Sequence, residues 1–187
     1  MRVRVQSRWF RREAARGPET IAGALAATAW RVARAMLADM RKADFELPPG
    51  PAYFAFLAES LAFLAQVAWR IAWERMGEDD RVAFATAMGR RMAQLLAENE
   101  SDLLRARPPG VIESEFIERL NARFEEYAEF GFGADGPDFA FLRYFASLVS
   151  EAVPEPDRRW VHDQVIAIEG PDGAATVARA LRGLLDG

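Results

Sequence analysis

Hydrophobic and polar positions recur along this chain with the period of α-helices, and one stretch is almost wholly apolar. In residues 52–73, eighteen of 22 side chains are apolar, and only Glu59 and Arg70 are charged. The stretch follows Pro48-Pro49-Gly50-Pro51 and ends shortly before a glycine. Prolines interrupt helices and glycine commonly closes them. The pattern therefore predicts one long helix over about 52–76.

Most of the remaining chain repeats apolar residues every three or four positions, which predicts amphipathic helices. No segment has the alternation of a convincing strand, and the loops between the helices are short. We therefore predict an all-α fold, an irregular antiparallel bundle of seven or eight helices around the central apolar helix. The expected helices cover about 19–43, 52–76, 78–98, 112–129, 139–153, 157–168 and 172–185, with 7–16 as a further short basic helix or an arm.

The length of 187 residues predicts a single helical domain. Arg107-Pro108-Pro109-Gly110 is the best candidate for an internal break, and it is a weak one. Residues 1–16 are expected to form a flexible basic arm. The high alanine and arginine content is typical of a GC-rich bacterial genome. No secretory signal is visible, so we expect a cytoplasmic protein.

The apolar helix has two candidate surroundings, lipid or protein. A membrane span needs about 20 apolar residues with few charges, and the stretch has that length. However, Glu59 lies well inside it, where an acid in a bilayer costs roughly 2.5 kcal/mol or more. The pattern favours a buried core helix over a membrane span.

The polar residues of this helix fall on one narrow strip. At 100° per residue, Glu59, Gln66 and Arg70 lie within about 40° of one another, with Glu74 near the edge. One interpretation is an edge that faces water, with Arg70 and Glu74 paired four residues apart. The alternative is an apolar pocket with a few polar anchors. That alternative predicts a ligand-binding site at Glu59, Gln66, Arg70 and Trp73.

The net charge of −4 hides an asymmetry. Residues 1–42 hold ten basic and three acidic side chains, whereas the rest of the chain is strongly acidic. Arginines interleaved with aromatic residues suit an anionic surface, such as lipid headgroups or nucleic acid. No helix-turn-helix pattern follows, which disfavours nucleic acid. The chain's own acidic surface, or a partner's, would fit the same charges. The candidate residues for such contacts are Arg2, Arg4, Arg8, Arg11, Arg12 and Arg16.

The chain lacks the residues that most kinds of catalytic site require. The chain has no cysteine and a single histidine, His162, so thiolate chemistry and a multi-histidine metal site within one chain are excluded. Residues 131–136 match G-x-G-x-x-G, but they follow an expected helix rather than a strand, so we predict a glycine-rich turn. We therefore predict no catalytic residue, metal or cofactor.

These observations favour a non-enzymatic protein that acts through helix-mediated protein–protein interaction and forms a homodimer. The first alternative is a small-molecule binding or regulatory domain, with an apolar ligand beside the central helix. The second is an enzyme that uses carboxylates or the lone histidine. The sequence identifies neither a ligand nor a partner.

Overall fold

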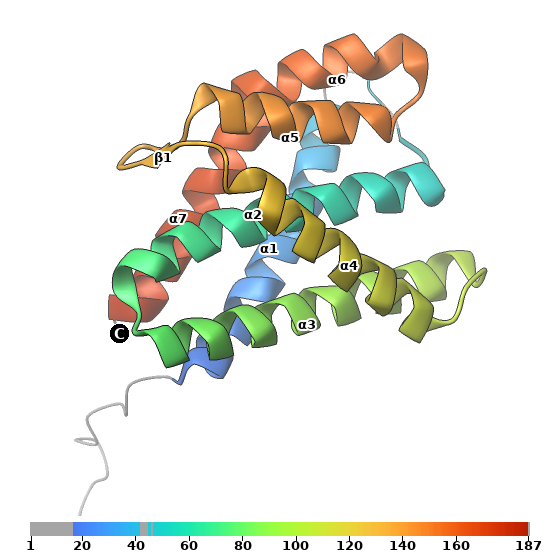
Figure 1. The fold of residues 1–187 in the computed structure, drawn as a ribbon. Coiled ribbons are helices and arrows are strands. Elements are labelled where there is room, and N and C mark those ends of the chain that lie inside the picture. Colours follow the sequence, from blue (N-terminus) through green and yellow to red (C-terminus); the bar gives the residue numbers. More distant parts are fainter. Residues whose placement is uncertain (1–16, 42–44, 46, 187) are drawn as a thin grey trace, which may run out of the picture.

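The structure of the protein, a computed structural model, describes residues 17–41, 45 and 47–186 (Figure 1). The predicted arm, residues 1–16, lies outside the described residues. Almost all regular structure is helical. Its elements are α1 (Pro18–Arg41), α2 (Pro51–Arg75), α3 (Glu78–Leu104), α4 (Pro109–Tyr127), β1 (Phe132–Gly133), β2 (Gly136–Pro137), α5 (Phe139–Glu151), a 3₁₀ turn (Glu155–Asp157), α6 (Arg158–Gln164), a π-helical turn (Val165–Glu169) and α7 (Gly170–Asp186).

The all-α prediction is confirmed, but the number of helices was wrong. The helices α6 and α7 continue into each other through the π-helical turn, so the described residues form six helical rods rather than seven or eight. We expected a break at Gly170-Pro171. Instead, the Gly170 N–H donates to the carbonyl of Val165, five residues earlier. This wider turn accommodates Pro171, which has no N–H to donate.

The turn also needs a glycine at position 170. A Cβ there would lie 2.8 Å from the Val165 carbonyl oxygen and 2.9 Å from Leu142 of α5. Such contacts are too short for any larger residue without movement of the backbone. The Gly170-Pro171 pair therefore marks a close approach to α5 rather than a break between two helices.

Helix α2 occupies the middle of the molecule. Sixteen of its 25 residues are buried, and it contacts α1, α3, α4, α5 and α7. Figure 1 shows α2 between α5 and α6 on one side and α3 on the other. Its large side chains Phe56, Leu57, Phe63 and Leu64 are fully buried, and burial of apolar area is the main stabilising contribution to such a core.

By length and composition alone, two helices among the described residues could cross a membrane: Pro18–Met40 of α1, and α2. Core helices of soluble proteins pass the same test. The most apolar 18-residue window is 78% buried inside the structure for α2 and 50% for α1. Most of the apolar surface of α2 is therefore already covered by protein.

Helix α4, which contributes residues to all the candidate sites, is connected to α3 before it and to the β1–β2 hairpin after it. Helix α3 continues without a break through Asn99 to Leu104, and it closes at Arg105, which has a left-handed backbone with φ of 51°. Asn99 donates a side-chain hydrogen bond to Leu95 O within the helix, and α3 continues past the predicted end at about residue 98. After α4, the glycine-rich run forms the predicted turn as a two-residue hairpin, β1–β2.

Candidate functional site

The polar strip of α2 faces α4 rather than water. Glu59 and Gln66 are only 3% and 2% exposed, so the interpretation of the strip as a solvated edge was wrong for both. Two arginines of α4 hold the Glu59 carboxylate. Arg123 donates to both carboxylate oxygens, at 2.8 and 2.9 Å, and Arg119 donates to Oε1. A buried carboxylate with two arginine partners is fully paired.

This pairing continues towards α5. Arg123 also donates to Glu126 at 2.6 Å, and the Tyr144 hydroxyl donates to the same Glu126 oxygen at 2.7 Å. The hydrogen bonds to Glu59 raise the pKa of Arg123. Burial alone would raise the pKa of Glu126, but the bonds from Tyr144 and Arg123 lower it overall. Burial and the Glu126 bond raise the pKa of Tyr144 to about 12.

Arg70 has a different role from the pairing with Glu74 that we considered. Its guanidinium donates to the carbonyls of Tyr127, the last residue of α4, and Phe130, just beyond it, at 2.8 and 3.1 Å. Carbonyls at the end of a helix have no partner within the helix, and a cation is favourable there. Arg70 therefore anchors the C-terminus of α4 to α2.

A cavity of about 290 Å³ lies beside the C-terminal part of the strip. It brings together three of the four residues predicted to bind a ligand, namely Gln66, Arg70 and Trp73. Glu59 does not line it. The Gln66 Oε1 atom is buried and has no hydrogen-bond partner among the described residues. The remaining lining residues are Trp69, Glu74, Phe124, Ala128 and Phe132.

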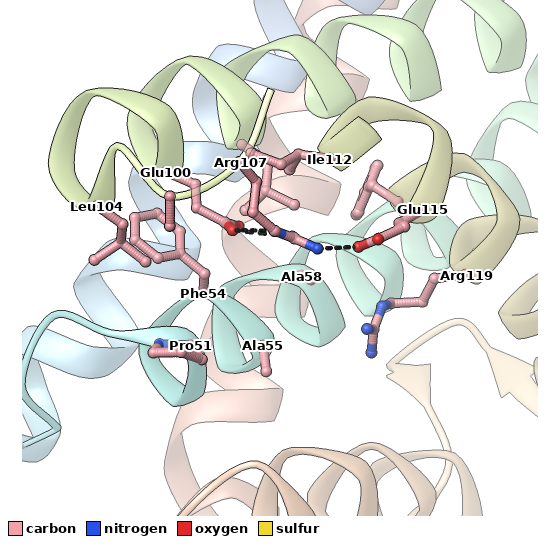
Figure 2. A pocket seen from close by; sticks show the side chains of 13 residues that line it. Pro51, Phe54, Ala55, Ala58, Glu100, Leu104, Arg107, Ile112, Glu115 and Arg119 are labelled. Atoms are coloured by element: carbon pink, nitrogen blue, oxygen red, sulfur yellow. Dashed lines mark hydrogen bonds and ion pairs between the residues drawn. The ribbon is translucent and has the colours of Figure 1, made fainter. Parts of the chain in front are cut away.

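A second cavity, of about 350 Å³, lies between α2, the end of α3 and the start of α4 (Figure 2). Figure 2 shows Arg107 between two acidic side chains. It donates to Glu100 at 2.9 Å and to Glu115 at 2.6 Å. Arg119, also in its wall, is bound to Glu59. Every charged group of this cavity is already engaged by another residue of the chain.

A third hollow, of about 1070 Å³, is a groove between α3 and α4. We call it the α3–α4 groove. Its apolar lining includes Gly89 and Ala93 of α3 and Ile117 and Leu120 of α4. A Cβ on Gly89 would lie 2.9 Å from Leu120, so the glycine lets the two helices approach closely. The polar lining residues are Thr86, Arg90, Glu113, Ser114, Glu118, Asn121 and Glu125.

The acids of this groove differ from Glu59, Glu100, Glu115 and Glu126, which are all bound to arginines. Glu118 and Glu125 are exposed and Glu113 is half-buried. Within the described residues, none of the three makes a hydrogen bond or an ion pair. Trp69 and Phe124 line both the groove and the cavity at Gln66, so the two hollows adjoin. The combined surface has aromatic walls and unpaired carboxylates.

The sequence did not identify the arginine partners of Glu59. The four-residue spacing of Glu115 and Arg119 is typical of a surface pair, but Glu115 binds Arg107 and Arg119 binds Glu59. The usable signal was the spacing of Arg119 and Arg123. They lie four residues apart, beside the apolar stripe of α4, where they can reach a neighbouring helix.

The predicted arginines Arg2, Arg4, Arg8, Arg11, Arg12 and Arg16 lie outside the described residues. Within the described part of the chain, no group of three or more His, Asp or Glu residues is placed to hold a metal ion. No protein-family model matches the chain, and neither a curated protein nor a solved structure gives a match. The functional argument therefore depends on the geometry of these hollows.

Proposed function

We propose that the protein acts by protein–protein interaction and that its α3–α4 groove binds a basic amphipathic segment of a partner. The single observation that supports this most strongly is the set of unpaired carboxylates beside an apolar floor. In the cavity between α2, α3 and α4, by contrast, both acids are bound to Arg107. Three glutamates against one arginine, Arg90, give the groove a net negative charge, and such an apolar groove suits an amphipathic helix with a basic polar face.

The dimensions of the groove suit a helix. Its lining on α4 extends from Glu113 to Glu125, twelve residues of rise, or about 18 Å at 1.5 Å per residue. A bound helix of about three turns would cover that length. Trp69 lies in the shared wall and Trp73 is 58% exposed. Aromatic residues of this kind are common anchors in interfaces.

A titration with a peptide tests the proposal. A fluorescent amphipathic peptide of arginine and leucine should bind the full chain, and its acidic counterpart should not. The variant Glu118→Lys/Glu125→Lys should weaken binding of the basic peptide by about tenfold or more, because it replaces attraction with repulsion. The matched control is Glu151→Lys/Glu155→Lys, which changes two exposed acids away from the groove. Equal binding by both variants would show that the groove is not the site.

Homodimerisation remains part of the proposal. Sedimentation of the full chain over a wide concentration range measures it directly. If the same groove mediates self-association, Glu118→Lys/Glu125→Lys should shift the protein towards monomer and the control variant should not. If the protein is a monomer at every concentration, the homodimer is excluded, but binding of a different protein in the groove is not affected by that result.

A second candidate function is binding of a small apolar ligand in the cavity at Gln66. The unpartnered Gln66 Oε1 favours it, because a buried acceptor without a partner costs roughly 1–3 kcal/mol. A flat ligand that carries an N–H or O–H donor would satisfy this acceptor between Trp69 and Trp73. In a thermal-shift screen of such compounds, Gln66→Leu should abolish stabilisation by any ligand found. Stabilisation that survives Gln66→Leu would exclude this cavity.

A further inference from the structure

The first 16 residues of the chain have the chemistry that the α3–α4 groove would select. They contain six arginines against one acid, with Trp9 and Phe10 among them. The groove combines unpaired carboxylates with an apolar floor. We infer that residues 1–16 dock into the α3–α4 groove of their own molecule. This inference rests on the proposed function, because it requires the groove to bind basic amphipathic segments.

The spacing of charges in the two segments matches. Glu118 and Glu125 are seven residues apart on α4, so they lie on one side of the helix with about 10 Å of rise between them. Arg4 and Arg11 are also seven residues apart. If the segment is helical in the groove, the same 10 Å separates these arginines. Two charge pairs can then form at once, with Trp9 between them along the chain.

The segment joins the described fold beside one wall of the groove. Residue 17 directly precedes α1, and α1 packs against α3, which forms one wall of the groove. In Figure 1 the N-terminal end of α1 lies near the first half of α3. With residues 4–11 in the groove, the six-residue step from Arg11 to Gly17 makes the connection to α1, and it spans up to about 20 Å when extended.

Docking within one molecule is favoured over docking between two copies. A tethered segment meets its site at an effective concentration on the order of 1 mM, far above the concentration of a dilute protein. The consequence is regulatory. Any partner of the groove must displace residues 1–16, so its apparent affinity is reduced by the fraction of grooves already occupied.

Competition with a labelled peptide tests this inference in the full chain. The probe is a fluorescent synthetic peptide with the sequence of residues 1–16, and anisotropy reports its binding. The test variant is Arg4→Glu/Arg8→Glu/Arg11→Glu, which removes the complementary charges from the tethered segment. The control is Arg4→Lys/Arg8→Lys/Arg11→Lys, which keeps them. We expect the test variant to bind the probe about tenfold more tightly than the unaltered chain, and the control to bind like the unaltered chain.

Other results would overturn the inference in distinguishable ways. If the unaltered chain and the test variant bind the probe equally, the segment does not occupy the groove, but the proposed function stands. If no variant binds the probe or any other basic peptide, the proposed function fails as well. If the unaltered chain is a dimer that the test variant converts to a monomer, the segment docks on a second copy instead.

Discussion

Helix α4 has arginines on the side that faces α2 and glutamates on the side that faces α3. The charges on the first side are paired within the chain, and those on the second are not paired with any residue that the structure describes. Towards α2, Glu59 is buried and bound by Arg119 and Arg123. Towards α3, Glu118 and Glu125 are exposed, with no hydrogen bond or ion pair among the described residues. The first arrangement is complete within the chain. The second leaves negative charge beside an apolar surface, as an interface for a partner does.

The comparison separates charges that maintain the fold from charges available for recognition. The chain contains nearly as many basic as acidic side chains, 24 against 28, so a shortage of arginines does not explain the unpaired acids. Arg90 lines the same groove and also makes no ion pair with a described residue. The distinction therefore predicts large effects on stability at the α2–α4 contact and large effects on binding at the groove.

The largest expected effect on stability comes from Glu59→Gln. The change keeps the volume but leaves Arg119 and Arg123 without their shared carboxylate, and the Arg123 side chain is only 18% exposed. Removing one partner of a buried ion pair typically costs about 3–5 kcal/mol. Because the Arg119 side chain is 38% exposed and water can solvate it, we expect a loss near the lower end, about 3 kcal/mol. Urea unfolding of both proteins measures it.

The matched control is Glu98→Gln, which breaks the ion pair of Glu98 with Arg91. Both of those side chains are more than 40% exposed. An exposed pair contributes about 0–1 kcal/mol, so the control should unfold close to the unaltered protein. If Glu59→Gln costs no more than Glu98→Gln, the Glu59 pairing is not what holds α4 against α2.

Periodicity predicted the helical rods well, because burial of one face dictates the spacing of apolar residues. It placed the central helix over about 52–76, against Pro51–Arg75 in the structure. It failed at Gly170-Pro171, where the residues typical of a helix break allow a π-helical turn instead. The reason is tertiary: Leu142 of α5 packs where a side chain on residue 170 would lie, and local propensity does not contain that contact.

The candidate site was less predictable for the same reason. Of the predicted set Glu59, Gln66, Arg70 and Trp73, the last three line one cavity and Glu59 does not. Helical geometry could not say what this face of α2 meets. Whether Glu59 faces water or two arginines depends on the position of α4, which is set by packing between segments 60 residues apart in the chain.

A smaller effect is expected from alkaline pH at the edge of the same network. The Tyr144 pKa is raised from 10.0 to about 12, by burial and by its bond to Glu126. Between these values, the unfolded chain loses the phenolic proton and the folded chain keeps it. The unfolded state then binds fewer protons, so the free energy of unfolding falls as pH rises from about 10 to about 12.

The variant Tyr144→Phe isolates this contribution. It removes the titrating group, so the decrease in stability over that pH range should become shallower in urea titrations at a series of pH values. At neutral pH it should cost about 1 kcal/mol through the lost hydrogen bond to Glu126. An unchanged alkaline slope would show that other groups control the high-pH unfolding; Tyr127, whose pKa burial also raises, is the first of these to examine.

The smallest effect on stability is expected in the groove itself. Glu118→Gln/Glu125→Gln removes two exposed carboxylates that have no partner among the described residues. Exposed substitutions without such partners usually change stability by less than about 0.5 kcal/mol. The same variant should weaken binding of a basic peptide, and the loss should shrink at high salt, because screening reduces exposed electrostatic attraction. A loss of stability above about 1 kcal/mol would mean that these carboxylates stabilise the fold, and the contrast with Glu59 would disappear.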